Sequence, residues 1–291
     1  MPELPEVETI RLGLKKYIVG YKVVDVEVRL KKMVHGEVKN IIGAKVQDVQ
    51  RFGKGLVIDF DNGYSIAAHI KLTGQFIYRG SGVQIYRISE NKVGGELPNK
   101  WTHVIFRLGE SVKGKAKRDS GTFLYYNDVR QFGWIRIVQS SKLKDQSFFK
   151  ELGPEFLKDL TIEKFKEIVS KANSPIKPLL MDQKKMSGVG NIYANDALFY
   201  AKIDPRTKAK TLTDVKLRKL YDSILHVLKE GLKYGGATEL NFVNALGQEG
   251  KYQDHFLVYG REKEPCRVCK TPIKKFKLAG RGTYFCPVCQ V

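Results

Sequence analysis

No stretch of the sequence is apolar for long enough to cross a membrane, and its first residues lack the basic-then-apolar pattern of a secretion signal. The sequence also lacks a lipidation motif, a basic amphipathic helix and an internal repeat. These absences favour a cytoplasmic protein without a membrane partner. Nothing in the sequence indicates an oligomer, so we expect a monomer.

Cysteine is rare, and acidic residues are outnumbered. All four cysteines lie within residues 266–291, and such bunching without a secretion signal argues against a disulfide framework. Asp and Glu number 31 against 51 for Lys and Arg, which leaves a net charge of +20. That excess indicates a polyanionic partner, because basic side chains that bind phosphates release counterions. Charge alone does not separate DNA, RNA and an anionic membrane.

The first half of the chain changes from a helical to a strand-like pattern. Apolar residues at spacings of three and four predict a helix from Leu4 to about Lys16. Period-two alternation then predicts a half-buried strand over 24–30. Similar runs lie around residues 44–50, 55–60, 64–72, 103–108, 122–127 and 133–138. We therefore expect residues 1–138 to form an N-terminal helix and an antiparallel β-sandwich domain.

The second half has helical patterns. Residues 139–160 are polar and include a Gly-Pro pair, which is typical of a linker. Apolar stripes predict helices from Ile162 and over about 213–234. We expect residues 161–259 to form a helical domain and residues 260–291 to form a separate small unit, so that the whole chain belongs to the α+β class.

The small terminal unit carries the most specific local pattern. Two Cys-x2-Cys pairs with sixteen residues between them match a structural zinc site with four thiolate ligands: Cys266, Cys269, Cys286 and Cys289. The intervening residues can form a β-hairpin with Arg281 at its tip. Redox dithiols or unpaired thiols are the alternatives, but both pairing and spacing match zinc. A site with four cysteine ligands is closed, so we expect one structural and non-catalytic Zn²⁺.

The opening residues carry chemistry of another kind. Removal of Met1 would give Pro2 a terminal secondary amine, and α-amino groups, with a pKa of about 7.7–8.0, are partly unprotonated at neutral pH. Such an amine forms an iminium when it attacks a sugar C1′. Glu3 and Glu6 lie beside it and can act as general acid and base. The alternative is that Pro and Glu simply favour the first turn of a helix.

Several residues of the sheet domain could also bind a ligand. Lys54 lies between two glycines, and His69 lies at a strand end. The structural alternatives are a solvated hairpin tip for the lysine and ordinary packing for the histidine. Arg130 and Phe132 share a turn, and such side chains can insert between base pairs. Residues 109–121 are basic and glycine-rich, and we expect them to form an exposed hairpin tip.

A further candidate lies in the helical domain. Gly188-Val189-Gly190 precedes Asn191, and asparagine is a good N-cap, so we expect a helix to begin there with Asn191 as its cap. Glycines before a helix leave backbone N–H groups accessible, and a phosphate could bind to them.

In this order the motifs resemble those of bacterial formamidopyrimidine-DNA glycosylase. The similar stretches are the opening Pro-Glu-Leu-Pro-Glu-Val-Glu-Thr, residues 176–182, residues 188–194 and the cysteine-rich end, and together they span essentially the whole chain. Leu4 resembles this branch rather than the endonuclease VIII branch, where glycine is typical. The resemblance implies that a helix-two-turn-helix domain and a zinc-finger β-hairpin with four cysteine ligands follow the β-sandwich.

The resemblance also implies a bifunctional enzyme of base-excision DNA repair. Such an enzyme removes oxidised purines, such as 8-oxoguanine and formamidopyrimidines, from double-stranded DNA and cleaves the abasic site by β,δ-elimination. Pro2 would be the nucleophile, Glu3 the acid that opens the sugar ring, and Lys54 a catalytic-site lysine. The implied DNA contacts are His69, Leu72, Arg130, Phe132, Lys177, Asn191 and Arg281.

Three positions depart from the family pattern. Leu72 replaces a common methionine, Gln131 replaces a second arginine, and residues 237–240 lack a lysine often found in the loop that covers the flipped base. These differences concern lesion preference rather than reaction type. Two alternatives stay open, namely the same fold acting mainly on oxidised pyrimidines and a damaged-DNA-binding protein without catalysis. Leu4 argues against the first, and the intact opening residues argue against the second.

Overall fold

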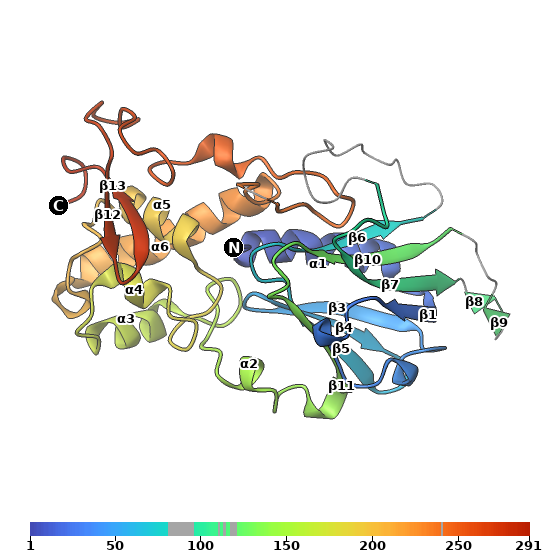
Figure 1. The fold of residues 1–291 in the computed structure, drawn as a ribbon. Coiled ribbons are helices and arrows are strands. Elements are labelled where there is room, and N and C mark those ends of the chain that lie inside the picture. The colour runs from blue at the N-terminus through green and yellow to red at the C-terminus, as the bar shows by residue number, and fades with distance from the viewer. Residues whose placement is uncertain (81–95, 110, 113–114, 117–120, 240) are drawn as a thin grey trace. The chain divides into compact units, whose positions relative to one another are not determined.

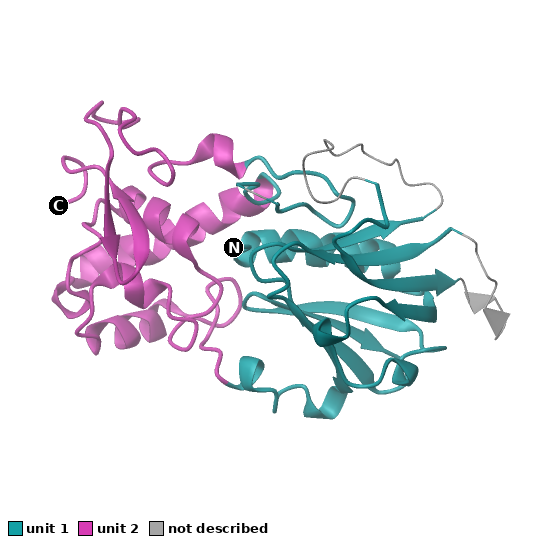
Figure 2. Ribbon diagram, in the orientation of Figure 1, with its two compact units in different colours: residues 1–150, 234–251 teal, residues 151–233, 252–291 magenta. Residues whose placement is uncertain are grey.

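The computed structural model describes residues 1–80, 96–109, 111–112, 115–116, 121–239 and 241–291 (Figure 1). Most of the basic tip predicted over 109–121 lies outside these residues. The contacts between residues divide the chain into two compact units, residues 1–150 with 234–251 and residues 151–233 with 252–291 (Figure 2). Among the described residues, no helix combines the length and apolarity needed to cross a membrane.

The division into two units differs from the predicted domain boundaries most clearly over residues 234–251. Residues 234–251, which we assigned to the helical domain, make their contacts with the first unit. The chain therefore leaves the second unit after its longest helix, contributes a segment to the first unit and then returns. The boundaries over 1–138, 139–160, 161–259 and 260–291 otherwise stay predictions.

The first unit consists of one long helix and two sheets around a shared core. Its elements are α1 (Leu4–Ile18), β1 (Lys22–Val28), β2 (Val34–His35), β3 (Val46–Phe52), β4 (Gly55–Phe60), β5 (Tyr64–His69), β6 (Gly74–Arg79), β7 (Thr102–Gly109), β8 (Ser111–Val112), β9 (Lys115–Ala116), β10 (Phe123–Asp128), β11 (Trp134–Gln139) and α2 (Ser147–Lys150). The sheets run in the orders β1-β7-β10-β6 and β2-β11-β5-β4-β3, while β8 and β9 pair with each other. All named pairs are antiparallel except β11 with β2. This is the predicted helix and β-sandwich.

Helix α1 forms for the reasons that its sequence suggests. Its apolar stripe, which includes Val7, Ile10 and Leu14, is fully buried in the core that both sheets share. A reciprocal capping box between Glu3 and Glu6 satisfies backbone groups at its first turn. Lysines in the last turn suit the negative end of the helix dipole. The helix thereby fixes the chain's opening residues against the sandwich.

Two strands of the sandwich, β2 and β6, were not predicted. Strand β6 has five consecutive buried residues from Gly74 to Tyr78, so it lacks the alternation that identifies a half-buried strand. The run predicted over 64–72 was also too long, because the chain turns after His69 and Lys71 has a positive φ of 51°. The other predicted strands lie within three residues of their observed bounds.

The second unit is helical and ends in a β-hairpin. Its helices and strands are α3 (Ile162–Ser170), α4 (Ile176–Leu180), α5 (Asn191–Ala201), α6 (Asp214–Lys233), β12 (Lys274–Leu278) and β13 (Arg281–Phe285). Helix α5 packs on α6 and on β13. The close approach of α5 to α6 requires a glycine, because a Cβ at Gly231 would lie 2.5 Å from the ring of Tyr193. This is the predicted helical domain with its terminal hairpin.

The start of α5 corrects one detail of the prediction. The N-cap is Gly190, and Asn191 is already the first helical residue, without a side-chain cap. The predicted cap is therefore one residue late, and the side-chain oxygen of Asn191 instead accepts a bond of 3.4 Å from Asn195 Nδ2.

Candidate active site

The opening residues lie at the amino end of α1. Pro2 and Glu3 are both buried, and Glu3 is the N-cap residue. The backbone N–H of Glu3 donates to Glu6 Oε2 at 2.8 Å, which fixes the direction in which the chain enters the helix. The residue proposed to carry the terminal amine therefore directly precedes a buried carboxyl group at a fixed helix start.

Glu6 does more than cap the helix. Its second oxygen, Oε1, accepts a hydrogen bond of 2.7 Å from the backbone N–H of Ala237. Gly236 has a φ of +83°, and a Cβ there would lie 2.9 Å from Glu6 Cγ. Both carboxylate oxygens thus accept backbone N–H groups inside the first unit, one from the opening residues and one from the segment after α6. The geometry favours a positioning role for Glu6, and its predicted acid–base role stays a prediction.

Lys54 is not a solvated hairpin tip, because its side chain is only 4% exposed. Buried Arg51 supports its loop by donating to Gly53 O at 2.9 Å and to Glu8 Oε2 at 2.8 Å. Burial opposes ionisation of Glu8, but hydrogen bonds from Arg11 and Arg51 outweigh it and hold the pKa of this carboxyl below its ordinary value. A chain of charged groups from α1 therefore fixes the turn that carries Lys54.

His69 is buried beside the rings of Phe148 and Trp134. Burial, followed by the positive charges of Lys71 and Lys54, lowers its pKa from 6.5 to about 3, so the ring is neutral at pH 7. Its Nδ1 accepts the backbone N–H of Lys71 at 3.0 Å, which leaves the single ring proton on Nε2. His69 can therefore act as a neutral hydrogen-bond donor.

Three residues predicted to enter DNA lie on two neighbouring turns. Leu72 is partly exposed, and Phe132 is 60% exposed, which is unusual for a large aromatic side chain. The guanidinium of Arg130 lies 5.0 Å from the ring centre of Phe132, within the range of a cation–π contact. These side chains are available to a partner without rearrangement of the core.

In the second unit, the turn before Asn191 is fixed by a residue that the sequence analysis did not identify. Gln183 donates to Met181 O and to Val189 O, both at 2.8 Å, and accepts the N–H of Gly188 at 3.0 Å. A side-chain amide can make all three bonds, because it has two donors and an acceptor. The residue lay within no recognisable motif, so only the folded turn reveals it.

Lys177, predicted to contact DNA, is almost fully buried. Its ammonium donates to Gly282 O at 2.9 Å and to Thr283 Oγ1 at 2.8 Å. Both acceptors follow Arg281, which is exposed at the start of β13 beside the Ala279-Gly280 turn. Lys177 therefore supports the hairpin that presents Arg281, and direct contact with DNA stays a prediction.

The four cysteines of the hairpin come together as predicted. They are unpaired thiols, and their sulfur atoms all lie within 4.8 Å of one another. The Sγ–Sγ distances are 3.3 Å for Cys269 and Cys286 and 3.9 Å for Cys266 and Cys289. Tetrahedral zinc with bonds of about 2.3 Å requires sulfur atoms about 3.8 Å apart, so the cluster fits the ion and excludes a disulfide. All four coordination positions are filled by protein, which makes the site structural.

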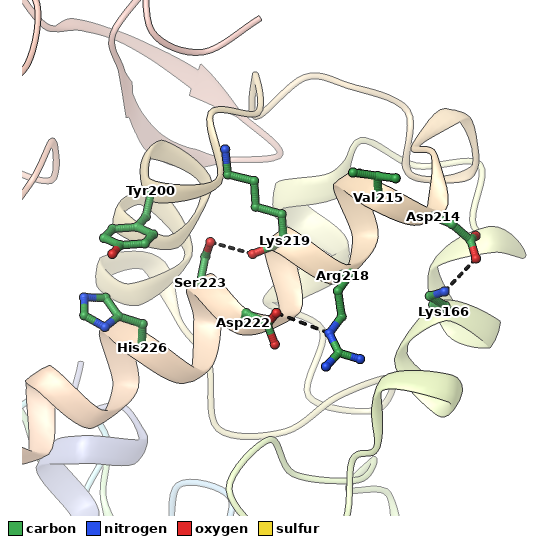
Figure 3. A pocket seen from close by; sticks show the side chains of 9 residues that line it. All are labelled: Lys166, Tyr200, Asp214, Val215, Arg218, Lys219, Asp222, Ser223 and His226. Atoms are coloured by element: carbon green, nitrogen blue, oxygen red, sulfur yellow. Dashed lines mark hydrogen bonds and ion pairs between the residues drawn. The ribbon is translucent and has the colours of Figure 1, made fainter.

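A separate pocket of about 760 Å³ lies on the second unit (Figure 3). Most of its lining comes from α6, with Tyr200 from α5 and Lys166 from α3. Two ion pairs, Lys166 with Asp214 and Arg218 with Asp222, neutralise most of its charge. It contains none of the residues predicted to act on DNA, so it is not part of the candidate active site.

Comparisons with known proteins agree with this geometry. Family models match residues 1–135 as "Formamidopyrimidine-DNA glycosylase N-terminal domain", 152–242 as "Formamidopyrimidine-DNA glycosylase H2TH domain" and 263–291 as "Zinc finger found in FPG and IleRS". The formamidopyrimidine-DNA glycosylase of Streptococcus mutans is 37% identical over 100% of this chain and 99% of its own length.

Solved structures give the same result. A Lactococcus lactis FPG mutant in complex with DNA containing Fapy-dG has a TM-score of 0.84 and 32% identity, with 99% of both chains covered. The Lactococcus lactis protein in complex with DNA containing an abasic site has a TM-score of 0.83 and 32% identity, with both chains covered completely.

Proposed function

This chain belongs to the formamidopyrimidine-DNA glycosylase family, and we propose that it excises damaged bases with the secondary amine of Pro2, exposed by removal of Met1. The protein is a bifunctional DNA glycosylase and abasic-site lyase of base-excision repair that acts on oxidised purines. The assignment of individual residues to steps is our proposal, as is the Schiff-base route through Pro2.

In the first step the amine of Pro2 attacks C1′ of the damaged nucleotide. A bond forms from nitrogen to C1′, the glycosidic bond breaks, and the base leaves with its electron pair and takes up the proton that the amine nitrogen loses. Glu3 then gives a proton to the ring oxygen as the C1′–O4′ bond breaks, which produces the iminium. The iminium acidifies the C2′ proton, so loss of that proton expels the 3′ phosphate. A second elimination releases the 5′ phosphate, and Lys54 assists by binding phosphate near the lesion.

The capping box of α1 is the observation that best supports this mechanism. The bond from Glu3 N to Glu6 Oε2 fixes the residue next to Pro2, so the amine and the Glu3 carboxyl keep one mutual geometry. Preorganisation of this kind removes the entropic cost of bringing reacting groups together. The bond that Glu6 Oε1 accepts from the N–H of Ala237 also holds this helix start in place, which a solvated helix start would not require.

The partner is DNA that contains damaged bases or abasic sites, and we propose a double-stranded substrate bound by one protein molecule. The base must leave the stack before C1′ is accessible, which costs a few kcal/mol. We propose that Leu72, Arg130 and Phe132 replace the lost stacking. His69, Lys177, Asn191 and Arg281 would bind phosphates or lesion, and the net charge of +20 would strengthen binding at low salt. We place this activity in the bacterial cytoplasm, where the chromosome lies.

Borohydride trapping tests the class of reaction and the nucleophile together. The substrate is a duplex with 8-oxoguanine opposite cytosine, and reduction of the iminium leaves a covalent protein–DNA band. The band should disappear for protein that retains a tag before Pro2, and should weaken for Pro2→Gly, whose terminal amine is primary rather than secondary. A tagged protein that still traps would contradict the assignment of the amine. Absence of trapping by the untagged protein would contradict the Schiff-base mechanism itself.

A further inference from the structure

The side chains proposed to enter the DNA stack lie on two loops of the first unit. Leu72 lies on the first loop, residues 70–73, which connects β5 to β6. Arg130 and Phe132 lie on the second loop, residues 129–133, which connects β10 to β11. Each loop carries the chain from one sheet of the sandwich to the other. The three side chains proposed to fill one gap in DNA thus come from two loops that are far apart in sequence.

The strands bring the two loops together. Asp128, the last residue of β10, pairs with Gly74, the first residue of β6. On the other sheet, Trp134 at the start of β11 pairs with His69 at the end of β5. The two loops therefore begin and end beside each other.

A buried carboxylate links the loops directly. The side chain of Thr73 donates a short hydrogen bond to Asp128 Oδ1, and both residues are buried. The N–H of Arg130 donates to Thr73 Oγ1 at 3.0 Å and to Asp128 Oδ1 at 3.2 Å. The other oxygen, Asp128 Oδ2, accepts the N–H of Gly133 at 2.8 Å. One carboxylate thus binds the end of the first loop and both ends of the second.

The backbone of Asp128 is held from the opposite side. Its carbonyl accepts a bond of 2.7 Å from His103 Nε2, and its N–H donates to Trp101 O at 3.0 Å. Because a carbonyl can only accept, His103 must be the donor. These two bonds fix the backbone of Asp128, and so they fix the position from which its carboxylate binds both loops.

The hydroxyl of Tyr126 lies beneath both loops. A Cβ added to Gly74 would lie 2.9 Å from this hydroxyl, and a Cβ added to Gly133 would lie 1.9 Å from it. Both loops thus approach the same buried oxygen. Between its two ends, the second loop adopts a positive φ of 55° at Gln131, a conformation that costs energy unless its surroundings impose it.

We propose that Thr73 and Asp128 are positioning residues that make Leu72, Arg130 and Phe132 enter DNA as a single rigid wedge. This inference rests on the proposed function. Hydrogen bonds to a buried carboxylate are strong and directional, so the loops lose little further entropy on insertion. Breaking the link leaves the three side chains in place but lets the two loops move separately.

The test compares two substrates in one sequence context. Excision of 8-oxoguanine requires a base to leave the stack, whereas cleavage of a preformed abasic site does not. Thr73→Val, which removes the hydroxyl at nearly constant volume, should slow single-turnover excision about tenfold, equivalent to about 1.4 kcal/mol of barrier. Cleavage of the abasic site should slow by less than about threefold, as no base must be extruded. Thr73→Ser retains the hydroxyl and should restore excision.

An epistasis measurement adds a readout that a general loss of stability would not change. In the Phe132→Ala background, Thr73→Val should have a much smaller effect on excision, because the wedge is already incomplete. Equal slowing of both substrates, or an unchanged effect in the Phe132→Ala background, would overturn the inference.

Hydrogen exchange of the free protein tests the link without DNA. Thr73→Val should speed exchange at the amides of Arg130 and Gly133 while exchange in β10 stays slow. Unchanged exchange at both amides would overturn the inference even if the protein excises 8-oxoguanine normally. Accelerated exchange in a protein without glycosylase activity would instead contradict the proposed function and leave the link between the loops supported.

Discussion

The ammonium of Lys177 lies 2.8 Å from the hydroxyl oxygen of Thr283, and so joins α4 to the zinc-finger hairpin two residues from Arg281. A buried lysine with hydrogen-bond acceptors on a neighbouring hairpin stabilises that hairpin rather than facing solvent. These contacts favour a supporting role for Lys177 over the direct DNA contact that its sequence position suggested.

Replacing Lys177 tests that distinction. Lys177→Met keeps the aliphatic stem but removes hydrogen bonds from a charged group, each worth about 1.5–3 kcal/mol. We expect affinity for DNA carrying an abasic-site analogue to fall because Arg281 is less well placed. Fluorescence anisotropy of Lys177→Met, Arg281→Ala and the double variant measures this. The double variant should bind about as weakly as Arg281→Ala alone, whereas additive losses would indicate that Lys177 contacts DNA itself.

The two bonds of Glu6 predict the effect of removing its charge. In Glu6→Gln one acceptor oxygen is replaced by an amide that cannot accept a backbone N–H, so the first unit should lose about 1–3 kcal/mol of stability. Urea unfolding measures the loss. Borohydride trapping should decrease, but the pH dependence of the remaining trapping should keep its shape, since a positioning residue does not exchange the proton. Loss of one limb of the pH profile would show that Glu6 is the acid or base.

His69 predicts a stability that declines in acid. Burial, Lys71 and Lys54 lower its pKa in the folded protein to about 3, against an ordinary value of 6.5. Between these two pKa values His69 binds a proton in the unfolded chain but not in the folded chain. The free energy of unfolding therefore rises with pH by up to about 1.4 kcal/mol per pH unit, and the contribution of His69 is complete above pH 6.5. Between about pH 7 and 5, His69→Gln should therefore lose less stability to acid than the unsubstituted protein. Equal losses in urea unfolding at the two pH values would contradict the assignment.

Removal of zinc should affect the second unit alone. Cys286→Ser takes away one of four ligands and should weaken DNA binding, because the hairpin that carries Arg281 no longer has a metal centre. Circular dichroism and hydrogen exchange should show the sandwich still folded. A chelator should have the same effect on the unsubstituted protein, and unfolding of both units in either experiment would contradict their independence.

Tyr126 gives a prediction of increased stability. Its hydroxyl is buried and has no hydrogen-bond partner within the described part of the chain. Removing it in Tyr126→Phe should stabilise the protein by about 1 kcal/mol, since an unsatisfied buried polar group costs about that much. Gly133→Ala should be strongly destabilising because its Cβ would lie 1.9 Å from that oxygen. The cost of Gly133→Ala should fall in the Tyr126→Phe background, and an unchanged cost would mean that the backbone, not the hydroxyl, forbids a side chain.

The sequence predicted the parts of this protein whose pattern is local. Helix α1 follows from apolar spacing and its capping residues, and the cysteine cluster follows from two spaced pairs. Strand β6 was missed because its run shows no alternation, and β2 was missed because two residues are too few to show any. Asn191 was assigned to the wrong helix position, because asparagine is the better N-cap by residue type but the folded turn makes Gly190 the cap.

Long-range partners could not be predicted. Nothing near Glu6 in sequence indicates Ala237, and nothing near Thr73 indicates Asp128. No role was predicted for Arg51 or Gln183, yet each fixes the backbone of a turn that carries a candidate functional residue. Which side chains touch across a fold depends on strand register and on turns, and these appear only when the chain is folded.

Helix α5 fixes a distance as well as a surface. Asn195, one helical turn after Asn191, accepts the N–H of Tyr284, three residues after Arg281. The two proposed phosphate ligands, Asn191 and Arg281, therefore lie in one unit, and its fold sets the span between them. DNA whose backbone does not match that span must deform to reach both, and the energy of deformation depends on the flanking bases. The protein can thus discriminate between DNA sites by their flanking sequence, before any nucleotide leaves the stack.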